Sequence, residues 1–205
     1  MKETLKSMSD ENKLKQSLTV VNYLLNNHLK FKSSNHIALY LAMKHEEIDT
    51  HILIEKLLSE CATNRKHIYA PHFEMKSNEM HFYEIKNMDQ YKNEMNVNNK
   101  FGIKQFNDPT RLRAADPKIF DLVLVPGLAF DYNADHTKIL RLGRGKGFYD
   151  SFLRQVSVKC YTLAVGFNEQ FISFNEKLIS DKVTLPVIET KDLMLDEFLC
   201  EKIIN

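Results

Sequence analysis

The sequence predicts an α/β layered domain with a largely parallel central sheet. Short apolar runs typical of strands alternate along the chain with segments whose apolar residues recur at helical spacing. The run 121–125 (DLVLV) is almost wholly apolar and is stopped by Pro126 and Gly127, which is typical of a strand buried on both faces. A length of 205 residues suits a single domain, 1–205, with a sizeable core.

The first 85 residues are expected to contain two helices and three strands. The expected helices are 9–29 and 50–61, and the expected strands are 35–42, 67–71 and 80–85. In the first helix one apolar stripe is expected to face the core: Leu14, Leu18, Val21 and Leu25. Ser9 or Asp10 would cap this helix, and Asp49 or Thr50 would cap the second. Later in the chain, 159–167 indicates another buried strand.

The composition is that of an ordinary globular protein. Hydrophobic residues make up 43% of the chain and charged residues 27%, with a net charge of +1. This balance gives no general signature of nucleic-acid or membrane binding, so any phosphate binding would be local. Three widely spaced cysteines, Cys61, Cys160 and Cys200, favour reduced thiols. With no signal peptide or spanning stretch apparent, we expect a cytoplasmic protein; no protein partner is evident, and a monomer is compatible with the sequence.

The stretch 141–150 (RLGRGKGFYD) is the most distinctive part of the sequence. Glycine at every second position, 143, 145 and 147, allows successive backbone N–H groups to point into one concavity that binds an anion. The cations between the glycines, Arg141, Arg144 and Lys146, suit a polyphosphate. Asp150 offers the hard oxygen ligand that Mg²⁺ prefers beside phosphate oxygens.

A helix is expected directly after this loop. Phe148, Phe152 and Val156 stand at helical spacing, so the loop would lead into a helix N-terminus whose dipole also favours anions. The glycine spacing fits neither the P-loop nor the Gly-x-Gly-x-x-Gly fingerprint. A glycine-rich hairpin loop with solvated basic residues is the alternative. The buried strand just upstream favours a ligand site, because ligands of α/β sheets gather beyond the carboxyl ends of strands.

The segment 122–131 (LVLVPGLAFD), followed ten residues later by 141–150, resembles the signature of the 5-formyltetrahydrofolate cyclo-ligase family. This resemblance implies a three-layer Rossmann-like sandwich of the NagB/RpiA/CoA-transferase type. It also implies ATP- and Mg²⁺-dependent cyclisation of 5-formyltetrahydrofolate to 5,10-methenyltetrahydrofolate. The implied reaction passes through a phosphorylated formyl group and releases ADP and phosphate.

The resemblance further implies roles for individual residues. Those implied to bind ATP are Lys2, Lys6, Arg141, Leu142, Gly143, Arg144, Gly145, Lys146, Gly147, Phe148 and Tyr149. Those implied to contact the folate are Lys6, Leu41, Glu47, Phe101, Gln105 and Tyr149. Arg144, Lys146 and Tyr149 would act in catalysis. Asp150 and Asp181 would bind Mg²⁺.

The sequence departs from the family pattern in two places and leaves other functions open. Lys6 replaces an arginine of the family, and Phe106 replaces a proline. By chemistry alone Lys2 and Lys6 would be solvated, while Phe101 would belong to the core. A non-catalytic homologue that binds ATP or folate is one alternative. Another is an ATP-dependent enzyme with a different acceptor, such as a small-molecule kinase, because the loop itself recognises phosphate rather than folate.

Overall fold

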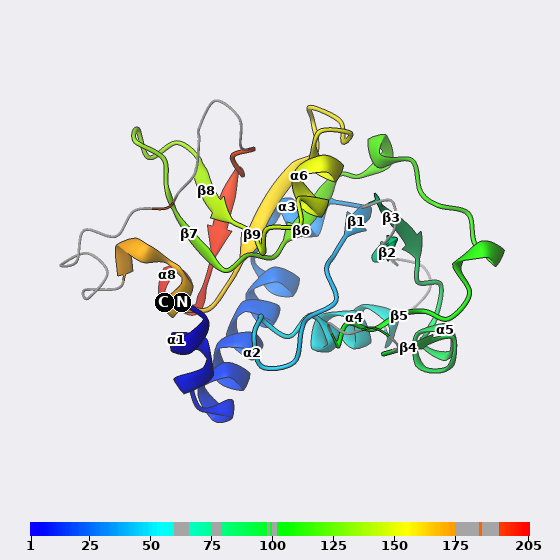
Figure 1. Cartoon of the computed structure of the whole chain (residues 1–205), viewed down its shortest axis with the longest axis horizontal. Coiled ribbons are helices and arrows are strands. Elements are labelled where there is room, and N and C mark those ends of the chain that lie inside the picture. Colours follow the sequence, from blue (N-terminus) through cyan, green and yellow to red (C-terminus); the bar gives the residue numbers. More distant parts are fainter. Residues whose placement is uncertain (60–65, 75–78, 98, 100–101, 175–184, 186–192) are drawn as a thin grey trace.

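The computed structural model has a mixed α/β fold built on a six-stranded central sheet (Figure 1). It describes residues 1–59, 66–74, 79–97, 99, 102–174, 185 and 193–205. The strands lie in the order β10 (Glu197–Leu199), β9 (Tyr161–Val165), β6 (Leu122–Val125), β1 (His36–Ala38), β2 (His67–Glu74) and β3 (Glu79–Glu84). All neighbours pair in parallel except β3, which runs antiparallel to β2 at one edge. The prediction of a largely parallel sheet is therefore confirmed.

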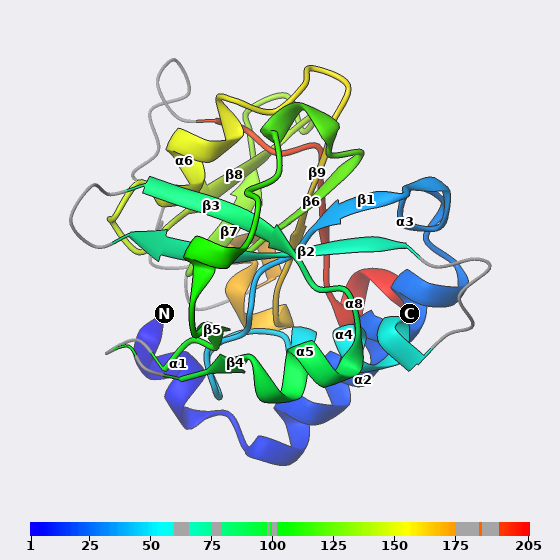
Figure 2. The ribbon, with the colours of Figure 1, turned by 90° about the vertical axis from the view of Figure 1, so that its right-hand side faces the viewer.

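Helices cover both faces of this sheet (Figure 2). One face carries α2 (Asp10–Asn26), α4 (Thr50–Ser59) and α8 (Glu201–Ile204). The other face carries α6 (Phe148–Leu153), whose Phe152 ring lies 4.5 Å from the ring of Phe82 on β3. Further short helices are α1 (Lys2–Ser7), α3 (Leu29–Ser33) and α5 (Met88–Asn93). This arrangement is the expected three-layer sandwich.

The centre of the sheet is fully buried, as its apolar sequence predicts. All four residues of β6 are inaccessible to solvent because helices lie against both faces. β1, by contrast, is shorter than the expected strand 35–42. It ends at Ala38, and residues 39–43 continue beyond the sheet toward the carboxyl ends of its neighbours.

The apolar stripe predicted on the first helix is wrong for two of its four members. Ser9 caps α2 as expected, but Leu14 and Leu18 are 52% and 38% exposed. Gln16 and Ser17 are buried instead. The Gln16 side chain accepts a hydrogen bond from the backbone N–H of residue 168, and the Ser17 hydroxyl accepts one from that of residue 49. Polar side chains with backbone partners can thus occupy the buried face, which apolar periodicity does not reveal.

A β-hairpin that the sequence did not predict carries the chain into the glycine-rich loop. Its strands, β7 (Ala129–Tyr132) and β8 (Ile139–Leu142), pair antiparallel and form a separate two-stranded sheet. A second small sheet pairs β4 (Met95–Asn96) with β5 (Gln105–Phe106). Cys160 and Cys200 are buried free thiols, and Cys61 lies outside the described residues. No helix in the described ranges combines the length and the apolar character that crossing a bilayer requires.

Candidate functional site

A pocket lies beyond the carboxyl ends of β1 and β6. The chain passes from β1 to β2 on one side and later returns to place β6 on the other side of β1, so the strand order reverses at this point. Open α/β sheets bind ligands at such switch points. Segments 40–47 and 126–127, which follow these two strands, line the pocket together with the glycine-rich loop and the first turn of α6.

Two glycines give the loop its shape. Gly145 and Gly147 have φ angles of +80° and +71°, in the left-handed region that favours glycine. Gly143 serves a different purpose, because a Cβ there would lie 2.8 Å from the Nη1 atom of Arg141. Gly147 also precedes α6, which ends at Leu153 rather than continuing to Val156 as expected. With only six residues in this helix, the loop's own N–H groups and cations are the main feature for anion binding.

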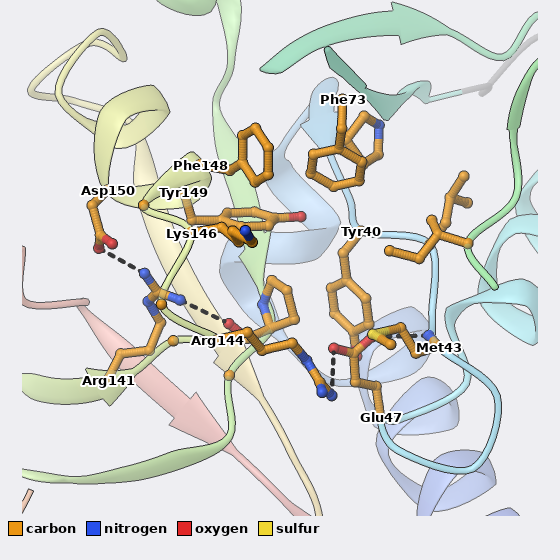
Figure 3. A pocket seen from close by; sticks show the side chains of 18 residues that line it. Tyr40, Met43, Glu47, Phe73, Arg141, Arg144, Lys146, Phe148, Tyr149 and Asp150 are labelled. Carbon is orange, nitrogen blue, oxygen red and sulfur yellow. Dashed lines mark hydrogen bonds and ion pairs between the residues drawn. The ribbon is translucent and has the colours of Figure 1, made fainter. Parts of the chain in front are cut away.

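The first cation of the loop, Arg141, is fixed in place (Figure 3). Its side chain is only 6% exposed and its Nη2 atom donates to Oδ1 of Asp150 at 2.6 Å. Its Nη1 atom donates to the carbonyl oxygen of Pro126 at 3.3 Å. The guanidinium also lies 5.9 Å from the centre of the Tyr149 ring. Arg141 therefore joins the loop to α6 and to the end of β6.

The other two cations differ from Arg141 and from each other. Arg144 reaches across the pocket, where Nη1 donates to Oε2 of Glu46 at 2.6 Å and Nη2 contacts Oε1 of Glu47 at 3.5 Å. Its Nε atom is buried and has no hydrogen-bond partner among the described residues. Lys146 is exposed and makes no ion pair within the described part of the chain.

Glu47 is held on the opposite wall by its own segment. Its Oε2 atom accepts a hydrogen bond from the backbone N–H of Met43 at 2.9 Å. The Tyr40 hydroxyl donates to the carbonyl oxygen of Ile48, and the Thr50 hydroxyl donates to the carbonyl oxygen of Tyr40. Burial raises the pKa of the Glu47 carboxyl, although the Met43 N–H and Arg144 oppose this shift. The segment thus presents a buried carboxylate to the pocket.

Apolar rings lie beside these charged groups. Phe148 of α6 and Phe73 of β2 have ring centres 5.0 Å apart and form one wall of the pocket. Tyr149 is buried next to them, and its hydroxyl has no hydrogen-bond partner in the described structure. Burial, reinforced by Glu47, raises the pKa of Tyr149, so the phenol stays neutral at neutral pH. An unpaired buried hydroxyl beside a flat apolar wall suits a planar ligand with polar edges.

Comparison with known proteins assigns the chain to a family. A profile of the 5-formyltetrahydrofolate cyclo-ligase family matches residues 1–199. The chain belongs to this family. It is similar to the 5-formyltetrahydrofolate cyclo-ligase of Mus musculus, at 28% identity over 206 residues that cover 98% of this chain and 90% of that protein. It is also similar to the mitochondrial 5-formyltetrahydrofolate cyclo-ligase of Arabidopsis thaliana, at 31% identity over 81% of this chain and 59% of that protein.

Solved structures of 5,10-methenyltetrahydrofolate synthetases have a similar fold. The 5,10-methenyltetrahydrofolate synthetase of Aquifex aeolicus matches with a TM-score of 0.69 and 26% identity, over 96% of this chain and 85% of that one. The 5,10-methenyltetrahydrofolate synthetase of Mycoplasma pneumoniae matches with a TM-score of 0.62 over 97% of this chain and 93% of that one. At 16% identity, the second likeness concerns the fold alone.

Most residues that the family resemblance singled out meet in the pocket. Those that line it are Leu41, Glu47, Arg141, Gly143, Arg144, Gly145, Lys146, Gly147, Phe148, Tyr149 and Asp150. Lys2 and Lys6 are exposed on α1, and Leu142 ends β8; none of these three lines the pocket. Gln105 lies on β5, with its Oε1 atom accepting from Asn99 and its Nε2 atom buried without a partner in the described structure. Phe101 and Asp181 lie outside the described residues.

Sequence reasoning missed several residues that complete the pocket. Met43 and Pro126 follow the ends of β1 and β6, and Phe73 lies near the end of β2. Their position at or after the carboxyl ends of strands that meet at the switch point was the available signal. Glu46 was not predicted as a site residue, although it holds Arg144 more closely than Glu47 does.

The described residues contain no group of three or more His, Cys, Asp or Glu side chains placed to hold a metal ion. Asp150, whose side chain is 35% exposed, is the loop's own carboxylate and is paired with Arg141. One carboxylate is compatible with Mg²⁺, because this ion usually keeps several waters and takes its remaining ligands from substrate phosphates.

Proposed function

We propose that this protein catalyses the ATP-dependent cyclisation of 5-formyltetrahydrofolate to 5,10-methenyltetrahydrofolate, with release of ADP and phosphate. The observation that carries the proposal is the pairing, across one pocket, of a cationic glycine-rich loop with a buried carboxylate. Membership of the 5-formyltetrahydrofolate cyclo-ligase family supports it. A site for polyphosphate and a site for a polar heterocycle would then be adjacent.

The loop side of the pocket would bind ATP. Lys146 is exposed and has no carboxylate partner among the described residues, so it is available to the phosphates. Arg141, fixed by Asp150, would supply a second positive charge at the base of the loop. The N–H groups around Gly143, Gly145 and Gly147 would complete the cradle. Lys2, Lys6, Leu142, Phe148 and Tyr149 are the further ATP contacts that the family resemblance suggests.

The opposite side would bind the folate. The Glu47 carboxylate would be an acceptor for the N–H donors on the edge of a pterin ring, and Leu41 also lines the pocket. Phe73 and Phe148 would contact the face of the ring. Lys6, Phe101 and Gln105 remain proposals from the resemblance.

The pocket offers positioning and charge rather than a protein nucleophile. The formyl oxygen is a poor leaving group, so the γ-phosphoryl group would first be transferred to it, and the P–O bond to ADP would break. The neighbouring folate N–H nitrogen then attacks the formyl carbon and loses its proton to water, and the C–O bond breaks as phosphate leaves. Arg144 and Lys146 would neutralise charge on the transferred group. The neutral Tyr149 hydroxyl would donate a hydrogen bond to the formyl or phosphate oxygen.

We also propose that Asp150 binds Mg²⁺, with Asp181 as a second candidate ligand. Bound there, the ion would neutralise part of the polyphosphate charge.

The buried free thiols of Cys160 and Cys200 suit a reducing compartment such as the cytoplasm. Fluorescence microscopy of a tagged chain would test that location.

The test of function is an assay of methenyltetrahydrofolate absorbance. Purified protein is mixed with ATP, Mg²⁺ and 5-formyltetrahydrofolate, and ATP is omitted from the control. We expect the absorbance to grow only with ATP. A folded protein that binds ATP without forming this product would contradict the proposal, and a stable phosphorylated product would identify a kinase instead.

A further inference from the structure

Arg144 lies on the folate side of the pocket rather than with the other cations of its loop. Figure 3 shows its side chain extended toward Glu47, whereas Arg141 turns toward Asp150. In the proposed function the phosphates are bound by the glycine-rich loop with Arg141 and Lys146, which line the pocket. In this position the Arg144 guanidinium is paired with carboxylates and is not available to bind phosphates.

Glu46 is the residue that keeps Arg144 there. Its Oε2 atom accepts from Nη1 of Arg144 at 2.6 Å, while the contact with Glu47 is 3.5 Å and the Glu47 carboxylate already accepts from Met43. Glu46 itself is placed by its backbone N–H, which donates to the carbonyl oxygen of Met43 at 3.1 Å. The main restraint on the Arg144 guanidinium thus comes from a residue outside the loop.

Three features of the ion pair between Glu46 and Arg144 favour exchange of Glu46 for a phosphate. Their side chains are 35% and 26% exposed, and ion pairs open to water contribute little to stability. Glycines on both sides of Arg144 leave its backbone free to rotate. A polyphosphate carries more negative charge than the Glu46 carboxylate and can accept two parallel hydrogen bonds from a guanidinium, whereas Glu46 accepts one here.

We propose that Glu46 is a positioning residue that holds Arg144 beside Glu47 until a polyphosphate takes the guanidinium. This inference rests on the proposed function, since the polyphosphate is the ATP of that reaction. Lys146, which has no ion-pair partner in the described structure, receives the phosphates first. Arg144 then leaves Glu46 for the phosphates, and Glu47 loses its cation and becomes free to accept from the folate.

The test compares nucleotide binding by wild-type protein and the Glu46→Gln variant. Isothermal titration calorimetry with a non-hydrolysable ATP analogue and Mg²⁺ is done without folate. Because Glu46 competes with the phosphates, we expect Glu46→Gln to bind the analogue about fivefold more tightly, the worth of roughly one hydrogen bond. Unchanged or weaker binding would overturn the proposal. Asp108→Asn is the matched control, because Asp108 pairs with Arg111 at 2.9 Å away from the pocket lining.

A second comparison separates exchange from a structural role. In an Arg144→Ala background, Glu46→Gln should leave the nucleotide affinity unchanged, because the competing guanidinium is gone. A stabilising role alone would lower the melting temperature of Glu46→Gln and leave its affinity unchanged, which contradicts the proposal. If wild type turns over and Glu46→Gln binds as wild type does, only this inference fails. If wild type neither binds the analogue nor turns over, the proposed function fails as well.

Discussion

The two arginines of the glycine-rich loop lie three residues apart and are held in opposite ways. Arg141 is almost fully buried and pairs with Asp150 of the helix that the loop begins. Arg144 is more exposed and pairs with carboxylates of a segment about 100 residues away in the chain. The pair of Arg141 and Asp150 thus lies within the stretch 141–150. The pairs of Arg144 join two distant segments, and in our proposal Arg144 exchanges these partners for a polyphosphate.

The largest expected effect on turnover is that of replacing Lys146, the loop cation that forms no ion pair with any described residue. Lys146→Ala should lower turnover by about 100-fold, because one donor to the transferred phosphoryl group is lost. Its melting temperature should match wild type, since Lys146 is exposed and forms no ion pair with any described residue. Steady-state assays with a thermal melt check this. Lys159→Ala, another exposed lysine, is the control and should retain full activity.

Replacing Arg141 should lower the stability of the fold more than replacing Arg144 does. Arg141→Ala leaves Asp150 and the Pro126 carbonyl without their donor, which should cost about 2 kcal/mol and lower Tm by about 4–8 °C. Arg144→Ala should change Tm far less because its pair is more exposed. Differential scanning calorimetry of both variants decides; equal losses would remove the distinction between them.

Asp150→Asn is expected to weaken the binding of Mg²⁺. An amide oxygen is a poorer ligand than a carboxylate, so the half-saturating Mg²⁺ concentration should rise about tenfold at constant ATP. The measurement is an Mg²⁺ titration of turnover. Activity equal to that of wild type at every Mg²⁺ concentration would contradict the assignment of Asp150 to the metal.

The smallest expected effect on stability is that of replacing Glu47, and it is a gain. Its folded pKa is raised above the ordinary 4.5, so its ionisation opposes folding at pH values above the folded pKa. Below the unfolded pKa both states are protonated and the penalty vanishes. Glu47→Gln should therefore raise Tm by about 2–4 °C at neutral pH and by less near pH 4, while folate binding is lost. A Tm increase independent of pH would contradict this cause.

The contrast between contacts within one stretch of the chain and contacts between distant segments explains how much of the fold and the site could be predicted from the sequence. Arg141, Lys146 and the glycines lie in one contiguous stretch, so their proximity could be predicted from the sequence alone. Gly145 and Gly147 do adopt the left-handed conformation that only glycine takes readily. The parallel sheet was equally predictable, because the fully buried β6 has a continuous apolar sequence.

Long-range contacts were not predictable in this way. The pairing of Glu46 with Arg144 joins segments that only the folded sheet brings together. The exposure of Leu14 and Leu18 depends on Gln16, whose backbone partner lies over 150 residues away. Periodicity records which side chains are apolar, and it does not record which polar ones find a buried partner.

The most direct test of the proposed chemistry follows the formyl oxygen. 5-Formyltetrahydrofolate labelled with ¹⁸O in the formyl group is converted in unlabelled water with ATP and Mg²⁺, and the released phosphate is analysed by mass spectrometry. If the γ-phosphoryl group is transferred to the formyl oxygen, each phosphate released carries one ¹⁸O atom. Product formation with unlabelled phosphate would contradict this route, because the formyl oxygen would then leave without having been phosphorylated.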